Sequence, residues 1–178
     1  MHLKKSWHNR SIYNTKKAIL KQSELGKVRF GVFGNASKNA CGVICLHNLK
    51  VILGTQTCFS KDYKNASRWG TNLYLGVFGT NPLYVNIKLS KLRILKKMFM
   101  VPKIDRLDSI FSQYDIVILA YSWGGIMDMH YATFQKNTDG TIKGYNTSQR
   151  RTYVNVNQLI MREPIKKVLF AWGINKTI

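Results

Sequence analysis

Residues 35–54 read NASKNACGVICLHNLKVILG and contain the strongest helical pattern of the chain. Positions 45, 46, 49, 52 and 53 are apolar and recur with helical spacing, and Gly54 stands where the end of a helix favours a left-handed residue. Cys41 falls in the first turn of this pattern. We therefore predict an amphipathic helix that buries one face and carries a cysteine at its N-terminal end.

The position of Cys41 makes it a candidate nucleophile. Unpaired N–H groups and the positive dipole end of a helix stabilise a thiolate, so we expect a lowered pKa and faster alkylation at Cys41 than at Cys45 or Cys58. A buried, unreactive cysteine is the competing interpretation. His47 cannot easily serve as the base, because six residues along a helix place it about 240° around the axis from Cys41. The base must come from elsewhere in the sequence.

A predicted β-hairpin supplies the base and a third polar group. His130 begins the predicted strand 130–135, and the turn-rich residues 136–140 connect it to a second predicted strand, 141–146. If residues 136–140 form the loop, Gln135 faces Thr141 and His130 faces Asn146. The Asn146 carboxamide could then accept a hydrogen bond from the imidazole and fix its tautomer, which is the orienting role of a third triad member.

The remaining patterns predict helices first and strands afterwards. Helices are expected at 11–25, in pieces over 61–97 with one opened by Asn81-Pro82 and running toward Phe99, and at 105–114; strands are expected at 116–121, 130–135, 141–146 and 168–172. This order indicates an α+β fold in which N-terminal helices pack against an antiparallel sheet. We divide the chain into a basic N-terminal extension, residues 1–30, and one domain, residues 31–178.

Composition narrows the classes of partner and compartment. The chain has 28 Lys and Arg against 8 Asp and Glu, a net charge of +20. Such a charge favours polyanionic partners, namely nucleic acid, anionic lipid or acidic peptides. The competing interpretation is a lysine-rich surface that has no specific partner. Three cysteines are too few for a disulfide scaffold, and the spacing of Cys41, Cys45 and His47 matches no common zinc site. We predict no metal or cofactor. Without a signal-peptide pattern or a long apolar run, a cytoplasmic protein is expected.

Residues 35–54 resemble the nucleophile segment of papain-like cysteine peptidases, in particular the C39 family, which removes double-glycine leaders from bacteriocins. In that family a glutamine lies six residues before the nucleophile and a glycine directly follows it; here these positions hold Asn35 and Gly42. His130 and Tyr131 resemble the His-Tyr strand of the family, and Asn146 takes the place of its aspartate sixteen residues later. Small stand-alone bacterial proteins of this type are more similar still.

The resemblance implies a papain-like fold and a Cys-His-Asn triad. Cys41 would be the nucleophile, His130 the base and Asn146 the orienting residue, with Asn35 and the Cys41 N–H binding the oxyanion. The substrate would be a peptide or protein cleaved after small or glycine residues, and an acidic leader would suit the net charge. Asn35 is one methylene shorter than glutamine, and the transmembrane and ATPase domains that accompany leader peptidases are not part of this sequence.

Three other functions use the same residues or the same charge. Deamidation or transfer to an amine would use the same triad. An inactive papain-like module could bind nucleic acid or anionic surfaces through its positive charge and through aromatic residues interleaved with basic ones, as in residues 61–69. An effector or toxin acting on proteins of a host or competitor would carry the same site.

Overall fold

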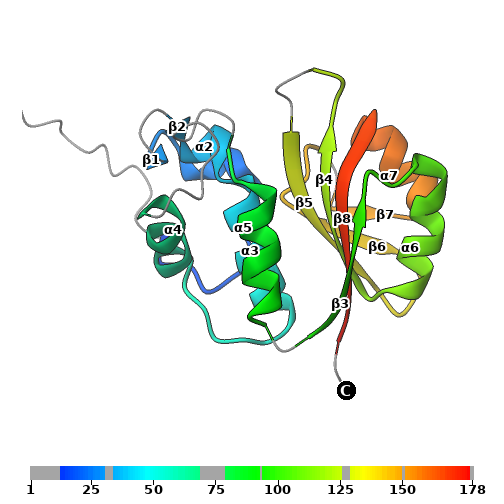
Figure 1. Cartoon of the computed structure of the whole chain (residues 1–178), viewed down its shortest axis with the longest axis horizontal. Coiled ribbons are helices and arrows are strands. Elements are labelled where there is room, and N and C mark those ends of the chain that lie inside the picture. Colours follow the sequence, from blue (N-terminus) through cyan, green and yellow to red (C-terminus); the bar gives the residue numbers. More distant parts are fainter. Residues whose placement is uncertain are drawn as a thin grey trace, which may run out of the picture.

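The computed structural model describes residues 13–30, 34–68, 79–92, 94–125, 129–149 and 151–176. A helical lobe and a sheet lobe lie side by side (Figure 1). The helical lobe contains η1 (Gln22–Leu25), β1 (Arg29–Phe30), β2 (Gly34–Asn35), α2 (Ala36–Asn39), α3 (Cys41–Ile52), α4 (Phe59–Arg68) and α5 (Pro82–Ser90).

The sheet lobe is built on an antiparallel sheet that has six strands among the described residues, in the order β3-β8-β4-β5-β6-β7. Its strands are β3 (Leu95–Met100), β4 (Ile116–Ser122), β5 (Met129–Lys136), β6 (Ile142–Tyr145), β7 (Thr152–Tyr153) and β8 (Lys167–Asn175). The helices η3 (Ile104–Arg106), α6 (Leu107–Gln113) and α7 (Val156–Arg162) complete this lobe.

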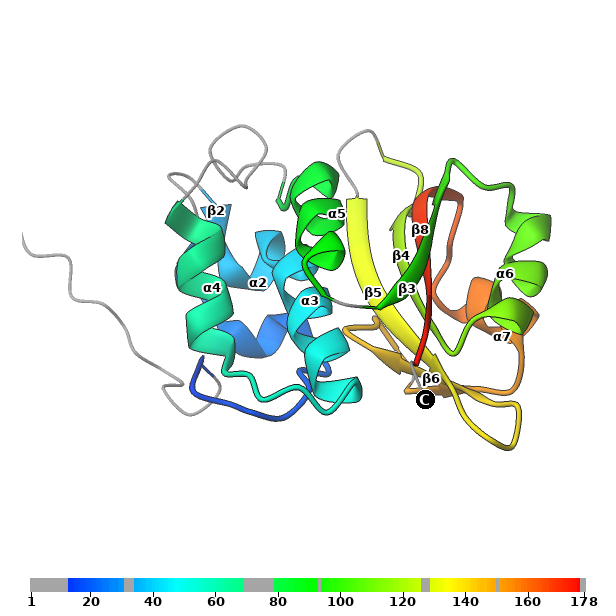
Figure 2. The same ribbon diagram turned by 60° about the horizontal axis from the view of Figure 1, so that its bottom comes forward.

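Helices cover both faces of the sheet. On one face α6 and α7 bury Leu107, Phe111 and Leu159 against the strands. On the other face α3 and α5 bury Leu49 and Val85 together with strand residues such as Trp172 (Figures 1 and 2). Each Å² of apolar surface that these contacts remove from water stabilises the fold by about 25 cal/mol, and this burial holds the layers together. The α+β class, with N-terminal helices against an antiparallel sheet, is confirmed.

Helix α3 joins the two lobes. It begins at Cys41 and ends at Ile52, and Gly54 follows with a φ of 71°, as the sequence predicts. All residues from Cys41 to Leu49 are buried, whereas the sequence predicts one buried face. The reason is that positions 45 and 49 pack on the sheet while positions 43 and 44 pack on the helical lobe. A helix enclosed in this way is a rigid mount for the side chain at its first position.

The segment before α3 differs from the prediction. Residues 13–25 do not form one continuous helix; the chain runs mostly without regular structure to η1, and Ile19, Leu25 and Phe30 are buried with α3. Asn48 of α3 fixes this segment, since it accepts from the Ile19 N–H at 2.7 Å and donates to the Ile19 carbonyl at 2.9 Å. Residues 13–30 therefore pack as part of the domain, and residues 1–12 of the predicted extension lie outside the described residues.

Most other elements agree with the sequence prediction. The helix over 105–114 and the four strands are confirmed within a few residues. The Asn81 side chain caps α5 by accepting from the Leu83 N–H at 2.9 Å, as expected for Asn-Pro at a helix start. This helix ends at Ser90 instead of reaching Phe99, because residues 95–100 pair with β8 as β3. None of the described helices combines the length and the apolar character that crossing a bilayer requires.

Candidate functional site

Cys41 lies at the boundary between the lobes. It is the first residue of α3, its exposed fraction is 2%, and the backbone N–H of Tyr131 on β5 is hydrogen-bonded to its sulfur. Tyr131 directly follows His130 in the chain. The fold thus brings the candidate nucleophile to the strand that carries the candidate base, across about ninety residues of sequence.

The pKa of Cys41 is the opposite of the sequence expectation. Burial raises the pKa of this thiol to about 11, and the hydrogen bonds from the backbone N–H groups of Tyr131 and Gly42 offset only part of that effect. Removing the thiolate from water disfavours it more than the helix N-terminus favours it. The prediction of a lowered pKa is wrong, and the resting side chain is a neutral thiol.

His130 is held in one tautomer. Its Nε2 lies 2.7 Å from the backbone oxygen of Asn146, and a carbonyl can only accept, so Nε2 carries the proton. In the neutral ring the lone pair is therefore on Nδ1. Burial lowers the pKa of His130 from its ordinary value. The imidazole is consequently neutral near pH 7 and able to accept a proton at Nδ1.

The hairpin register differs from the prediction by two residues. Gln135 pairs with Lys143, not with Thr141, and the ladder between β5 and β6 ends at Thr133 and Tyr145. Asn146 is therefore not the directly opposed partner of His130. It reaches the imidazole because the chain leaves β6 at Asn146 with a φ of 61°, a left-handed conformation that asparagine tolerates better than most residues.

Asn146 contacts His130 through its main chain. The predicted acceptor was the carboxamide, but the side-chain Nδ2 donates to the Tyr131 carbonyl at 2.9 Å. Its Oδ1 is buried and has no hydrogen-bond partner in the described part of the chain. The residue predicted to orient the imidazole is thus in contact with it, while the acceptor atom is the backbone carbonyl.

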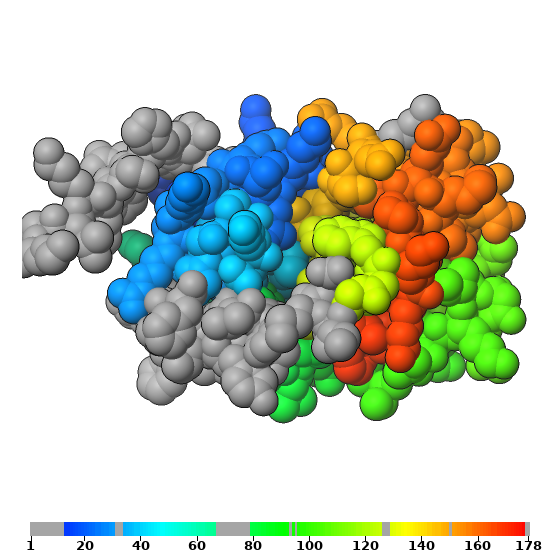
Figure 3. Space-filling view, turned by 90° about the horizontal axis from the view of Figure 1, so that it is seen from above, coloured from blue at the N-terminus to red at the C-terminus, as the bar shows by residue number. Residues whose placement is uncertain are grey.

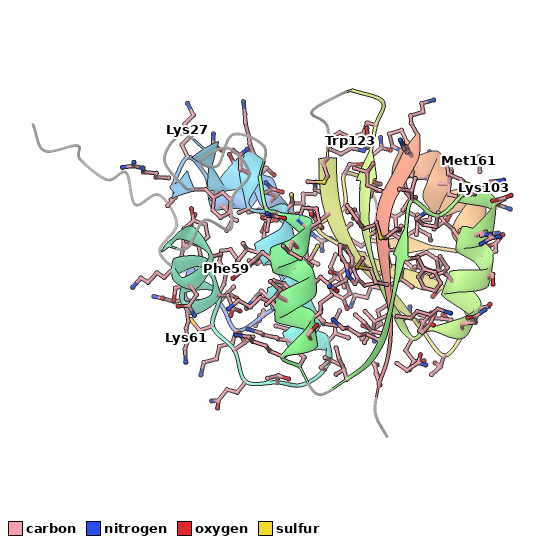
Figure 4. The ribbon with its side chains drawn as sticks, in the orientation of Figure 1. Lys27, Phe59, Lys61, Lys103, Trp123 and Met161 are labelled. Carbon is pink, nitrogen blue, oxygen red and sulfur yellow. The ribbon has the colours of Figure 1, made fainter. Side chains whose placement is uncertain are left out.

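Two aromatic rings enclose His130. Trp123 stacks on the imidazole with centroids 5.3 Å apart and an interplanar angle of 21°. Tyr121 contacts it edge-on at 5.5 Å. Figure 4 labels Trp123 at the end of the sheet where β4 finishes and β5 begins. The sequence prediction did not include Trp123, although its position just after a buried strand and before Gly124-Gly125 was a usable signal.

A cleft of about 500 Å³ opens between the lobes at His130. Its described lining comes from the helical lobe (Lys21, Gln22, Ser23, Ser37, Lys38, Asn39) and from the sheet lobe (Trp123, Met129, His130, Asn146, Thr147, Ser148). Figure 3 looks onto this rim, where residues near the start of the chain, in blue, meet residues near 122 and 147. Two lysines and no carboxylate belong to the described lining, so the cleft favours anionic groups.

Comparison with known proteins bears on the fold. No family model and no curated protein matches the sequence. Among solved structures, the peptidase domain of Streptococcus ComA, a bi-functional ABC transporter involved in a quorum-sensing pathway, matches with a TM-score of 0.53 and 9% identity. The match covers 84% of this chain and 100% of that one. The fold is papain-like.

Asn35 does not line the described cleft of this papain-like fold. Its Oδ1 accepts from the Ser37 hydroxyl at 2.8 Å, and its N–H donates to Asn39 Oδ1 at 3.0 Å. Asn39, two residues before Cys41, is one of three carboxamides in the described lining, with Gln22 and Asn146. The oxyanion role of Asn35 stays a prediction.

The glycine after the candidate nucleophile has a packing reason. A Cβ at Gly42 would lie 2.7 Å from Thr80 Cβ, a separation that real Cβ atoms do not show. The Thr80 carbonyl in turn accepts from the Tyr131 hydroxyl at 3.2 Å. Gly42 therefore lets residue 80 lie across the start of α3 and tie it to β5.

Cys45 and His47, two of the residues considered for a zinc site, have other contacts. His47 Nε2 lies 3.0 Å from the Lys17 carbonyl, and its Nδ1 lies 3.4 Å from Asp62, too far for a strong hydrogen bond. Cys45 is buried against the sheet. Within the described ranges, no three His, Cys, Asp or Glu side chains converge as metal ligands.

Alkylation is expected to follow an order different from the sequence prediction. Cys58 precedes α4, is partly exposed, and has a pKa lowered chiefly by a hydrogen bond with Ser60, 3.2 Å away. We expect iodoacetamide at pH 7 to modify Cys58 first and Cys41 slowly, with peptide mass spectrometry as the measurement. A Cys58→Ser protein should lose the fast phase. Fast modification of Cys41 in that variant would contradict the buried neutral thiol.

Proposed function

We propose that this protein is a cysteine peptidase with Cys41 as nucleophile and His130 as general base. One observation carries the proposal: the backbone N–H of Tyr131 is hydrogen-bonded to the Cys41 sulfur, and the preceding residue, His130, is held in the tautomer whose Nδ1 can accept a proton. A thiol, an oriented imidazole and an adjacent cleft are the parts that acyl transfer requires. The papain-like fold supports this combination.

The proposed mechanism begins from a neutral pair. His130 Nδ1 takes the thiol proton as the sulfur attacks the substrate carbonyl, and the Asn146 carbonyl stabilises the resulting imidazolium through Nε2–H. The Cys41 N–H is the proposed donor to the oxyanion, and Asn35, which does not line the described cleft, is the second donor that the resemblance implies. The imidazolium then protonates the leaving amine, the C–N bond breaks, and water, deprotonated by His130, releases the acyl group and regenerates the thiol.

We propose an acidic peptide as the substrate class. Lys21 and Lys38 lie in the cleft lining without a carboxylate among the described residues there, and the whole chain carries +20. Such a surface attracts anionic peptides and raises their rate of encounter. Cleavage after glycine or another small residue follows from the resemblance to the C39 family.

A peptide panel tests this function. Peptides with a Gly-Gly core flanked by glutamates are expected to be cleaved at least tenfold faster, by kcat/KM, than matched peptides flanked by lysines, and the difference should shrink in 0.5 M salt (roughly 4 Å Debye length). Cys41→Ala is expected to abolish cleavage, whereas Cys58→Ser should leave it intact. Mass spectrometry of the products gives the cleavage site. Cleavage that persists in Cys41→Ala would exclude this nucleophile.

Two other functions are alternatives to peptide cleavage: one uses the same catalytic residues, and the other uses only the cationic surface. Deamidation or amine transfer would appear as ammonia release or as a hydroxamate formed in the presence of hydroxylamine. An inactive binding module is favoured by the cationic cleft; it would bind nucleic acid or anionic vesicles with affinity that falls steeply with salt and ignores Cys41→Ala. Trp69, one of the aromatic residues that motivated this alternative, lies outside the described residues.

A further inference from the structure

Glu163 is a buried carboxylate behind the candidate site. It follows α7, its exposed fraction is 0%, and no lysine or arginine of the described ranges pairs with it. Four donors satisfy it instead: the hydroxyls of Tyr121 and Tyr153 at 3.2 and 2.6 Å, and the backbone N–H groups of Ser148 and Gln149 at 2.8 and 3.4 Å. Burial of a charge without a counter-charge costs several kcal/mol, so its retention calls for a reason.

Three contacts of Glu163 lead toward His130. Tyr121, which donates to the carboxylate, contacts the imidazole edge-on. Trp123, which stacks on the imidazole, donates its indole N–H to the backbone carbonyl of Glu163 at 3.2 Å. The backbone N–H of Ser148 ties down the turn whose first residue, Asn146, accepts from His130 Nε2. Glu163 is thus hydrogen-bonded to all three structures that surround the imidazole: Tyr121, Trp123 and the 146–149 turn.

The charge of Glu163 also acts on the imidazole. A negative charge behind His130 favours the protonated ring and opposes the effect of burial. The other titratable groups facing the site are the neutral thiol of Cys41 on α3, the hydroxyl of Tyr121 on β4, whose pKa burial raises well above its usual value, and Lys21 and Lys38 across the cleft. None of these other groups is a carboxylate, so among the described groups around the site Glu163 is the source of negative charge.

We propose that Glu163 is a positioning residue for His130: it fixes Tyr121, Trp123 and the 146–149 turn around the ring and stabilises the imidazolium that forms when the Cys41 thiol gives up its proton. The catalytic part of this inference rests on the proposed peptidase function. The coupling between Glu163 and the charge of His130 exists with or without turnover. A purely structural anchor would hold the turn without any coupling to the charge of His130.

Two variants of opposite sign test the coupling. Glu163→Gln removes the charge and is expected to lower the pKa of His130, measured by NMR titration of its ring C–H signals, and to lower kcat/KM at pH 7 about tenfold. Tyr153→Phe keeps the charge but removes the 2.6 Å hydrogen bond that partly neutralises it, so the pKa of His130 is expected to rise. Glu24→Gln, an exposed acid in η1, is the matched control and should change neither quantity.

The outcomes separate the two proposals. An NMR pKa of His130 that stays constant in both Glu163→Gln and Tyr153→Phe would overturn the positioning role, even if activity fell. If Glu163→Gln does not fold, the pKa of His130 in Tyr153→Phe decides alone whether Glu163 is coupled to His130: a raised pKa supports the coupling and an unchanged pKa contradicts it. If the wild-type protein cleaves no peptide, the titration still measures the coupling, so failure of the peptidase proposal is seen separately.

Discussion

Replacement of His130 by alanine is expected to lower kcat/KM for peptide cleavage by a factor of about 10³ or more. General base catalysis contributes roughly 10²–10⁴. The loss should lie toward the upper end here, because a thiol with a pKa of about 11 is only about one part in ten thousand ionised at pH 7 without a base beside it. Steady-state cleavage of the glutamate-flanked Gly-Gly peptide is the measurement. The fold should survive, since His130 lies at the edge of the cleft.

His47→Gln is the matched control for this prediction. His47 is fully buried and contacts the Lys17 carbonyl, away from the described cleft lining, so its replacement should lower thermal stability and leave kcat/KM of the folded protein within about threefold. The reverse pattern, with activity lost in His47→Gln and kept in His130→Ala, would remove His130 from the mechanism. Equal loss in both would point to unfolding, which circular dichroism of each variant detects.

Asn48→Ala is expected to lower the free energy of unfolding by about 3–5 kcal/mol, a large effect for one residue. The substitution leaves the N–H and the carbonyl of Ile19 buried without their partner, and each such group costs roughly 1–3 kcal/mol. Urea denaturation followed by tryptophan fluorescence gives the value. Asn65→Ala, at an exposed position of α4, is the control and should change stability by less than about 0.5 kcal/mol.

This experiment also tests the role of residues 13–30. If these residues belong to the domain, as their packing on α3 indicates, the loss is large and unfolding stays a single transition. A change below about 1 kcal/mol, or a separate early transition, would restore the sequence-based view of a detachable extension.

The sequence predicts the parts of this fold that depend on local patterns. The helix with Cys41 at its start, the Asn81 cap of α5 and the β-branched strand at 116–121 all follow from periodicity and from residues with strong local preferences. β3 was missed because its residues satisfy a helical pattern as well as a strand, and pairing with β8 decides between them. The helix expected at 11–25 rests on Ser11 and Gly26 as end signals, whereas the apolar residues between them carry no helical period and pack on α3 instead.

The candidate site shows the same division at the level of single atoms. Sequence spacing brought Cys41, His130 and Asn146 together as a hypothesis, and the fold places the first beside the strand of the second, and the second within 2.7 Å of the third. Which atom of Asn146 accepts could not be predicted, because it depends on the hairpin register and on a positive φ at one residue. Glu163 acts on His130 through Tyr121, Trp123 and the 146–149 turn, and no spacing in the sequence signals this link.

By itself the sequence determined which segments become helices and strands with strong patterns, the excess of positive charge, and the residue types available for chemistry, because these depend on neighbours within a few positions along the chain. Tertiary structure decided the ionisation of Cys41, the tautomer of His130 and the buried charge behind it. Those properties depend on burial and on hydrogen-bond partners that lie far away in sequence, and only the packed lobes bring such partners within reach.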